Sequence, residues 1–245
     1  YQLALMFGRF LVQLEDFPGP PLHETIPDFH DGLKRLKDFR EALASDPHNR
    51  AYSAKTDIDF LLERASWFEV IPGLIQRGDI PIRISHNDTK INNVMLDNST
   101  GEGVCVIDLD TVMNGTSLFD FGDLARTTLS PRDEDERDLS RVAAEMPRFA
   151  AILKGYLAGA GQVLTPKEKE YLVFSCKLMP LLIGMRFLTD YLLGDVYFKI
   201  HRPGQNLDRC RRQFELIRSI TDQEEEMNKI VFASGGQHAA HAPSL

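Results

Sequence analysis

The chain has 245 residues, a mass of 27.7 kDa and a formal net charge of −8. Hydrophobic residues make up 43% and charged residues 26%, a globular composition that excludes a disordered or fibrous chain. The acidic balance argues against nucleic acid or an anionic membrane as a partner, because both attract a basic face. We find no apolar run of the length that a membrane span needs. Three scattered cysteines show no disulfide or zinc spacing, so we expect a reducing, cytoplasmic setting.

Apolar residues at helical spacing predict three helices in the first third of the chain. They cover residues 1–15, 30–44 and 58–68. We expect Pro72-Gly73 to interrupt the third of these apolar stripes.

The pattern then changes to short apolar runs, which predict strands at 82–84, 94–96 and 104–107. The turn-rich segment 97–101 lies between the last two runs, so these should form a hairpin. Cys105 lies within an apolar run and is expected to be a small core residue.

Helical patterns return in the second half of the chain, at 142–157, 165–193 and 206–230. Thr165-Pro166-Lys167-Glu168 is typical of a helix start, with Thr165 as the N-cap and Glu168 completing a capping box. Residues 234–245 are rich in Gly, Ala and His and are expected to be a disordered tail. The predicted fold class is therefore α+β, mostly α.

Polar residues collect at the two ends of the predicted hairpin. Strand pairing should bring Asp108 back beside Asn93, with the carboxylate of Asp88 nearby. Carboxylate and amide oxygens of this kind suit Mg²⁺. Lys90, two residues after Asp88, adds a cation that would hold a phosphate.

The pattern His-x-Asp-x-Lys-x-x-Asn at 86–93 resembles the catalytic loop of protein kinases, and Asp108 resembles their second metal-binding Asp. The sequence is more similar to the aminoglycoside phosphotransferase and choline kinase branch of that superfamily. Asn87 stands where protein kinases have Arg, and Asp-Leu-Asp at 108–110 replaces Asp-Phe-Gly.

Within that branch, the segments 22–30, 86–95, 106–113 and 186–192 are similar to the N-acetylhexosamine 1-kinases. The resemblance implies an enzyme that uses ATP and Mg²⁺ to phosphorylate the anomeric hydroxyl of GlcNAc or GalNAc. Its partners would then be a nucleotide and a small sugar. The oligomeric state stays open.

Residue roles follow from the resemblance. Asp88 would orient the sugar hydroxyl and accept its proton, and Lys90 would meet the transferred phosphate. Asn93 and Asp108 would hold Mg²⁺ against the nucleotide phosphates. Asp110 would bind metal, contact substrate or hold the loop, and the sequence does not separate these roles.

Two further residues are implied as sugar contacts, Arg186 and Tyr197, although Arg186 would also suit an exposed surface position. His86 is expected to brace the catalytic loop rather than to transfer a proton. Asp120 and Asp123 are expected to be loop braces or helix caps.

No Gly-rich phosphate loop precedes the catalytic loop, and the first 80 residues are helical in pattern. We therefore expect residues 1–233 to be the C-terminal lobe of a protein-kinase-like fold, with the hairpin as a small β insert carrying the catalytic and metal loops. The N-terminal ATP lobe would lie outside this chain, so the chain alone is expected to be inactive.

Three alternatives stay open at this point. The protein would be an aminoglycoside or other small-alcohol kinase, or a non-catalytic sugar-binding or protein-interaction lobe. A metal-dependent hydrolase would use the same carboxylates, but the site lacks the His ligands common in such enzymes.

Overall fold

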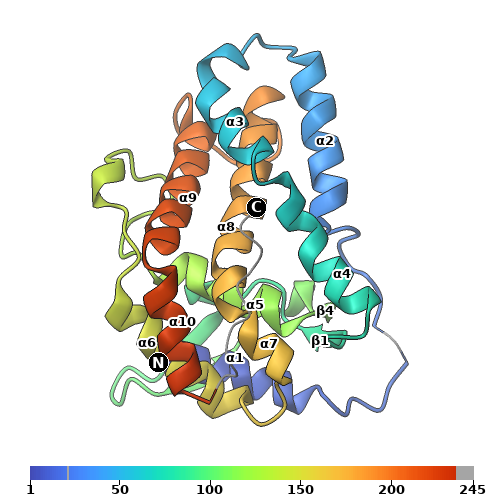
Figure 1. The fold of residues 1–245 in the computed structure, drawn as a ribbon, viewed down its shortest axis with the longest axis vertical. Coiled ribbons are helices and arrows are strands. Elements are labelled where there is room, and N and C mark those ends of the chain that lie inside the picture. Colours follow the sequence, from blue (N-terminus) through green and yellow to red (C-terminus); the bar gives the residue numbers. More distant parts are fainter. Residues whose placement is uncertain (21, 236–245) are drawn as a thin grey trace.

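The computed structural model describes residues 1–20 and 22–235, and helices dominate it (Figure 1). The α-helices are α1 (Gln2–Gln13), α2 (Gly32–Ser45), α3 (Lys55–Leu62), α4 (Val70–Gln76), α5 (Ser117–Thr128), α6 (Met146–Ala160), α7 (Pro166–Glu170), α8 (Leu172–Leu192), α9 (Gln205–Asp222) and α10 (Glu224–Ala233). The 3₁₀ helices are η1 (Tyr52–Ala54), η2 (Ala65–Glu69), η3 (Ile91–Asn93), η4 (Leu109–Thr111) and η5 (Leu139–Arg141). The strands are β1 (Arg83–Ser85), β2 (Val94–Leu96), β3 (Gly103–Val106) and β4 (Met113–Gly115). The mostly helical α+β prediction is confirmed.

Helix α8 runs through the middle of the molecule and packs against α9, α5 and α2 (Figure 1). A Cβ at Gly122 of α5 would lie 2.5 Å from the carbonyl oxygen of Ser175, so this glycine permits the close approach of α5 to α8. The sequence analysis overlooked that α8 is long and apolar enough to cross a membrane. However, 89% of its apolar window is buried inside the structure, as in a core helix of a folded domain.

Most predicted helices form, but the third apolar stripe is divided differently from the prediction. Helix α3 ends at Leu62 and a 3₁₀ turn follows, whereas Pro72-Gly73 lies inside α4. The predicted interruption at Pro72 is wrong, because Pro72 is the third residue of α4 and needs no backbone donor there. Helix α2 starts at Gly32, where the side chain of Asp31 accepts the N–H of Lys34.

The C-terminal helices are also shorter than predicted. Helix α6 begins at Met146, with Pro147 in its first turn. The predicted helix 165–193 breaks at Tyr171, and the predicted helix 206–230 breaks at Gln223. The predicted tail from residue 236 onward lies outside the described residues.

The predicted hairpin is confirmed as an antiparallel pair of β2 and β3, with Val94 opposite Val106. The N–H of Ile107 donates to the carbonyl oxygen of Asn93 at 2.9 Å, which extends the pairing to the mouth of the hairpin. Cys105 is exposed, so its expected core position is wrong. A two-stranded sheet that packs on α1 through one face leaves its other face in solvent.

A second antiparallel pair, β1 with β4, was not predicted as a pair, and a buried ion pair anchors it. Glu168 is fully buried and accepts hydrogen bonds from Arg83, Ser117 and the N–H of Thr165 at 2.7–2.9 Å. The Thr165–Glu168 capping box is confirmed. Burial alone would raise the pKa of Glu168, but these hydrogen bonds lower it, so the carboxylate is ionised. This network joins β1, α5 and α7 beneath the candidate site.

Candidate active site

The loop that follows β1 is fixed from below by Asp120 of α5. Its carboxylate accepts the N–H groups of His86 at 3.1 Å and Asn87 at 2.8 Å, and its carbonyl accepts the hydroxyl of Thr89. Burial raises the pKa of Asp120 to about 7, and the two N–H donors act against that rise. Asp120 is therefore a loop brace, as predicted.

His86 braces the same loop from its other side. It is fully buried, with Phe7 and Phe10 of α1 edge-on to its ring. Its Nδ1 accepts the N–H of Asp88 at 3.2 Å, so Nε2 carries the proton and donates to the carbonyl of Ile107 at 3.0 Å. Burial lowers the pKa of His86, which keeps the ring neutral in this structural role.

Four predicted residues converge above these braces. Lys90 Nζ lies 2.5 Å from Asp88 Oδ2 and 3.5 Å from Asp108 Oδ2. Asn93 Nδ2 donates to the carbonyl of Asp88 at 2.8 Å and to its carboxylate at 3.2 Å. Burial alone would lower the pKa of Lys90, but the two carboxylates raise it, so the ammonium is charged. The cluster carries two negative charges and one positive charge, and Asp108 is 45% exposed at its edge.

This cluster has the donor chemistry of a Mg²⁺ site. Asn93 turns its amide nitrogen toward Asp88, so these hydrogen bonds do not use its amide oxygen, which would be the ligand of a metal ion. Within residues 1–20 and 22–235, no group of three or more His, Cys, Asp or Glu is placed to hold a metal ion. An ion held by one amide and one carboxylate needs further oxygens, and nucleotide phosphates would supply them. The hydrolase alternative gains no support from this donor set.

Asp110 follows the cluster in the 3₁₀ turn η4. Its carbonyl accepts the hydroxyl of Thr25 at 2.5 Å, and the residue is exposed. In the described part of the chain its carboxylate makes no hydrogen bond or ion pair, so it is available to a ligand.

Arg186 and Tyr197 line a separate hollow of about 360 Å³. The guanidinium of Arg186 lies 5.4 Å from the ring of Phe29, 5.8 Å from Tyr197 and 5.5 Å from Phe198. Arg186 is half-buried among these rings rather than placed on an open surface, and this burial lowers the pKa of its guanidinium. Phe29 and His30 connect the hollow to the Asp88 cluster. The ring of Phe29 lies beside Arg186, and Nε2 of the next residue, His30, lies 2.6 Å from the carbonyl oxygen of Asn87.

Asp190 shapes this hollow and was missed by the sequence analysis. Its buried carboxylate accepts the backbone N–H groups of Val196, Tyr197 and Phe198 at 2.8–3.0 Å, and the side-chain amide of Asn206 at 2.8 Å. It thereby holds the loop that carries Tyr197. Helical periodicity does not predict that a carboxylate will accept hydrogen bonds from backbone N–H groups six to eight residues later in the chain.

Comparison with known proteins agrees with the geometry of the catalytic loop. Residues 1–166 match the sequence model of the phosphotransferase enzyme family, APH. The matched region contains the Asp88 cluster and the hairpin, and it ends before Arg186 and Tyr197. Because this match covers more than half of the chain, the chain belongs to the phosphotransferase enzyme family.

Proposed function

We propose that this protein is an ATP- and Mg²⁺-dependent kinase that phosphorylates an N-acetylhexosamine at its anomeric hydroxyl. Membership of the family supports phosphotransfer to a small molecule. The observation that carries the rest is the convergence of Asp88, Lys90, Asn93 and Asp108 in one half-exposed cluster. Membership of a phosphotransferase family also argues against a non-catalytic lobe.

Each residue of the cluster has a distinct task. Asp88 would accept a hydrogen bond from the acceptor hydroxyl, align its oxygen and take its proton. Lys90, already charged between two carboxylates, would neutralise charge on the transferred group. Asn93 and Asp108 would hold Mg²⁺. When bound, ATP and Mg²⁺ supply the phosphoryl group and screen its negative charge.

The hairpin offers a surface for the nucleotide base next to this cluster. Met95 is 54% exposed, Ile107 37% and Leu109 52%. Ile107 and Leu109 flank Asp108 in sequence, so apolar surface adjoins the predicted metal ligands. A planar base binds such a surface through dispersion and area burial.

The hollow at Arg186 supports a neutral sugar as acceptor. An Arg and a Tyr donate hydrogen bonds to hydroxyl and amide oxygens, and an aromatic ring stacks on a sugar face. Arg35, Asp38, Arg186 and Asp190 line the hollow. Asp38 forms salt bridges with Lys34 and Arg35, and the carboxylate of Asp190 is used by the loop backbone. Two guanidinium groups disfavour a polycationic aminoglycoside.

The test measures turnover of a panel of acceptors by the full-length protein with Mg-ATP. We expect turnover of GlcNAc or GalNAc, with a product phosphorus resonance coupled to the anomeric proton. Arg186→Ala should raise KM for the sugar on the order of 10- to 100-fold and leave KM for ATP unchanged. The matched control is Arg40→Ala, an exposed residue of α2. Turnover of kanamycin or choline, but of neither sugar, would refute the sugar assignment while leaving the kinase assignment intact.

A further inference from the structure

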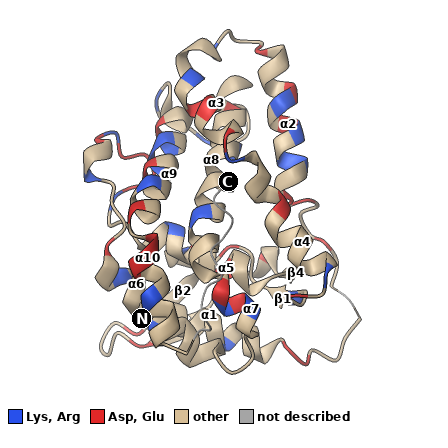
Figure 2. Cartoon of the chain, in the orientation of Figure 1, with Lys and Arg blue, Asp and Glu red and all other residues tan. Residues whose placement is uncertain are grey.

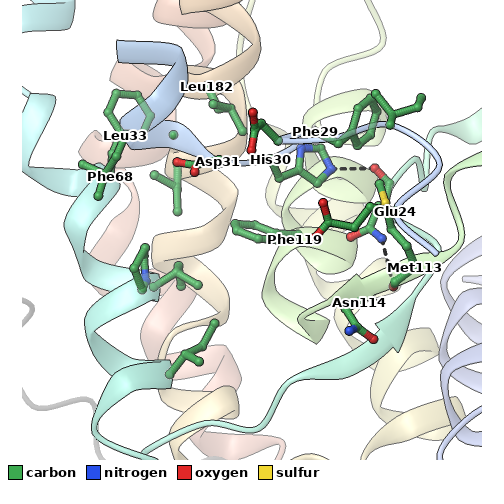
Figure 3. A pocket seen from close by; sticks show the side chains of 18 of the residues that line it. Glu24, Phe29, His30, Asp31, Leu33, Phe68, Met113, Asn114, Phe119 and Leu182 are labelled. Carbon is green, nitrogen blue, oxygen red and sulfur yellow. Dashed lines mark hydrogen bonds between the residues drawn. The ribbon is translucent and has the colours of Figure 1, made fainter. Parts of the chain in front are cut away.

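A larger pocket, of about 510 Å³, is separate from the Arg186 hollow and has Phe29 and His30 in its lining (Figure 3). Its volume is in the range of small-molecule sites. Much of its wall is apolar and comes from the 3₁₀ turn η2, from α4, α5 and α8. The apolar side chains that matter most are Phe68, Ile71, Ile75, Phe119, Leu178 and Leu182.

The charged residues that line this pocket are all acidic. They are Glu24, Asp28 and Asp31, and the lining contains no Lys or Arg. Asp31 is engaged as the N-cap of α2. Glu24 and Asp28 are exposed, and their carboxylates form no hydrogen bond or salt bridge with any other described residue. The two hollows therefore differ in charge: the Arg186 hollow is lined by two Arg and two Asp residues, whereas this pocket has only acidic charged residues in its lining.

Nearby cations do not neutralise these carboxylates directly. Lys34 and Arg35, the basic residues that follow Asp31, form their salt bridges with Asp38. Asp28 contributes only a longer-range attraction to Lys34. The carboxylates of Glu24 and Asp28 therefore have no paired cation beside the apolar wall of the pocket.

His30 gives this pocket a third feature. Its Nε2 faces the carbonyl of Asn87 at 2.6 Å and so carries the ring proton. Its Nδ1 is a buried acceptor with no donor among the described residues. An apolar wall, two free carboxylates and an acceptor without a donor are together complementary to an ammonium ion on an apolar body.

From this complementarity we propose that the pocket is a second ligand site, which binds a small organic cation with an apolar body, such as an arylalkylammonium ion. The pocket is distinct from the phosphotransfer cluster, because its lining includes Asn87 and not Asp88. A bound cation contacts His30 and thereby the carbonyl that precedes Asp88, so it acts on the back of the catalytic loop. The inference does not depend on which acceptor the enzyme phosphorylates.

The experiment compares phenethylammonium with its neutral analogue 2-phenylethanol by calorimetry. The apolar bodies match, so the ratio of the two dissociation constants reports on the charge. We expect the cation to bind at least about tenfold more tightly at low salt, because the two carboxylates attract the cation and not the neutral alcohol. Equal affinities, or no binding of either probe, would overturn the proposal.

Matched double variants test whether the cation binds at the carboxylates of this pocket. Glu24→Gln with Asp28→Asn should remove most of the preference for the cation. Asp16→Asn with Glu102→Gln makes the same change in net charge at exposed positions outside the pocket lining and should preserve it. Loss of the preference in both double variants would mean that only net charge matters, which would refute the site.

Two further measurements separate this pocket from the acceptor site. Leu33→Trp, at a half-exposed position of the lining, should fill the pocket and abolish binding of both probes. Retained binding would place the probes elsewhere. Phenethylammonium has no hydroxyl and is not an acceptor, so GlcNAc should not displace it. Competitive displacement by GlcNAc would make this the acceptor pocket and would overturn the inference of a second site.

Discussion

Asp190→Asn tests whether one buried carboxylate builds the Arg186 hollow. The carboxylate accepts four hydrogen bonds at 2.8–3.0 Å, three of them from consecutive backbone N–H groups at 196–198. An amide keeps one oxygen and presents N–H₂ to the remaining donors, so at least one backbone N–H loses its partner. Hydrogen bonds to a charged group contribute about 1.5–3 kcal/mol each, and water at this exposed loop recovers part of the loss. We expect the free energy of unfolding to fall by about 2–3 kcal/mol.

The assays separate a loop defect from general instability. Hydrogen exchange should show loss of protection at the amides of 196–198, and urea unfolding should show the lower stability. In the active enzyme, KM for the acceptor should rise by about tenfold with KM for ATP unchanged. Asp222→Asn, at the exposed end of α9, is the control. Wild-type stability together with wild-type amide protection in Asp190→Asn would refute the reasoning.

The remaining predictions concern the catalytic loop. Asp88→Asn should lower kcat on the order of 10²- to 10⁴-fold with little change in ATP binding, and near-normal turnover would remove Asp88 from the mechanism. Asp108→Ala should abolish Mg²⁺-dependent turnover and Asn93→Ala should raise the Mg²⁺ requirement, which a metal titration of the rate measures. Burial lowers the pKa of His30 to about 4, below its usual 6.5, so the unfolded chain binds the proton first on acidification. His30 should therefore contribute a fall of up to about 3 kcal/mol in the unfolding free energy between pH 6.5 and 4, measured as the difference between the pH profiles of the wild type and a His30→Phe variant.

Features that depend on neighbouring residues were predictable from the sequence. The hairpin turn forms because Asp97 accepts the N–H groups of Ser99 and Thr100. Asp and Ser are typical turn residues, so the sequence predicts this turn. The capping box at Thr165 is a pattern of four residues, and both of its hydrogen bonds form. The convergence of Asn93 and Asp108 follows from pairing the two strands on either side of this turn.

Features that depend on distant packing were not predictable in the same way. Cys105 has an apolar neighbourhood in sequence, but its exposure depends on which face of a two-stranded sheet meets α1. The break at Gln223 coincides with a hydrogen bond from its side chain to the carbonyl of Ala144, 79 residues earlier in the chain. Asp190 lies in a helix whose pattern is largely apolar, and its role appears only when the loop folds back on it.

The distribution of charged residues over the molecule also depends on the packing of distant parts of the chain. Figure 2 shows basic and acidic side chains interleaved along α2 and α9, so the net charge of −8 does not describe any one face. The larger pocket has only acidic charged residues in its lining, whereas the Arg186 hollow is lined by two Arg and two Asp residues. Composition excluded a strongly basic protein, but it had no bearing on this local separation of charge.

The segment 24–33 therefore connects the parts of the site that the sequence presents as separate motifs. Phe29 contributes to the aromatic enclosure of Arg186, and the next residue, His30, bonds the carbonyl of Asn87. Thr25 bonds the carbonyl of Asp110 within the same segment. One irregular stretch thus touches a ring beside Arg186, the loop that carries Asp88 and the turn after Asp108. Because a displacement of this stretch would move all three together, the geometry of phosphotransfer depends on a segment that contributes no residue to the Asp88 cluster.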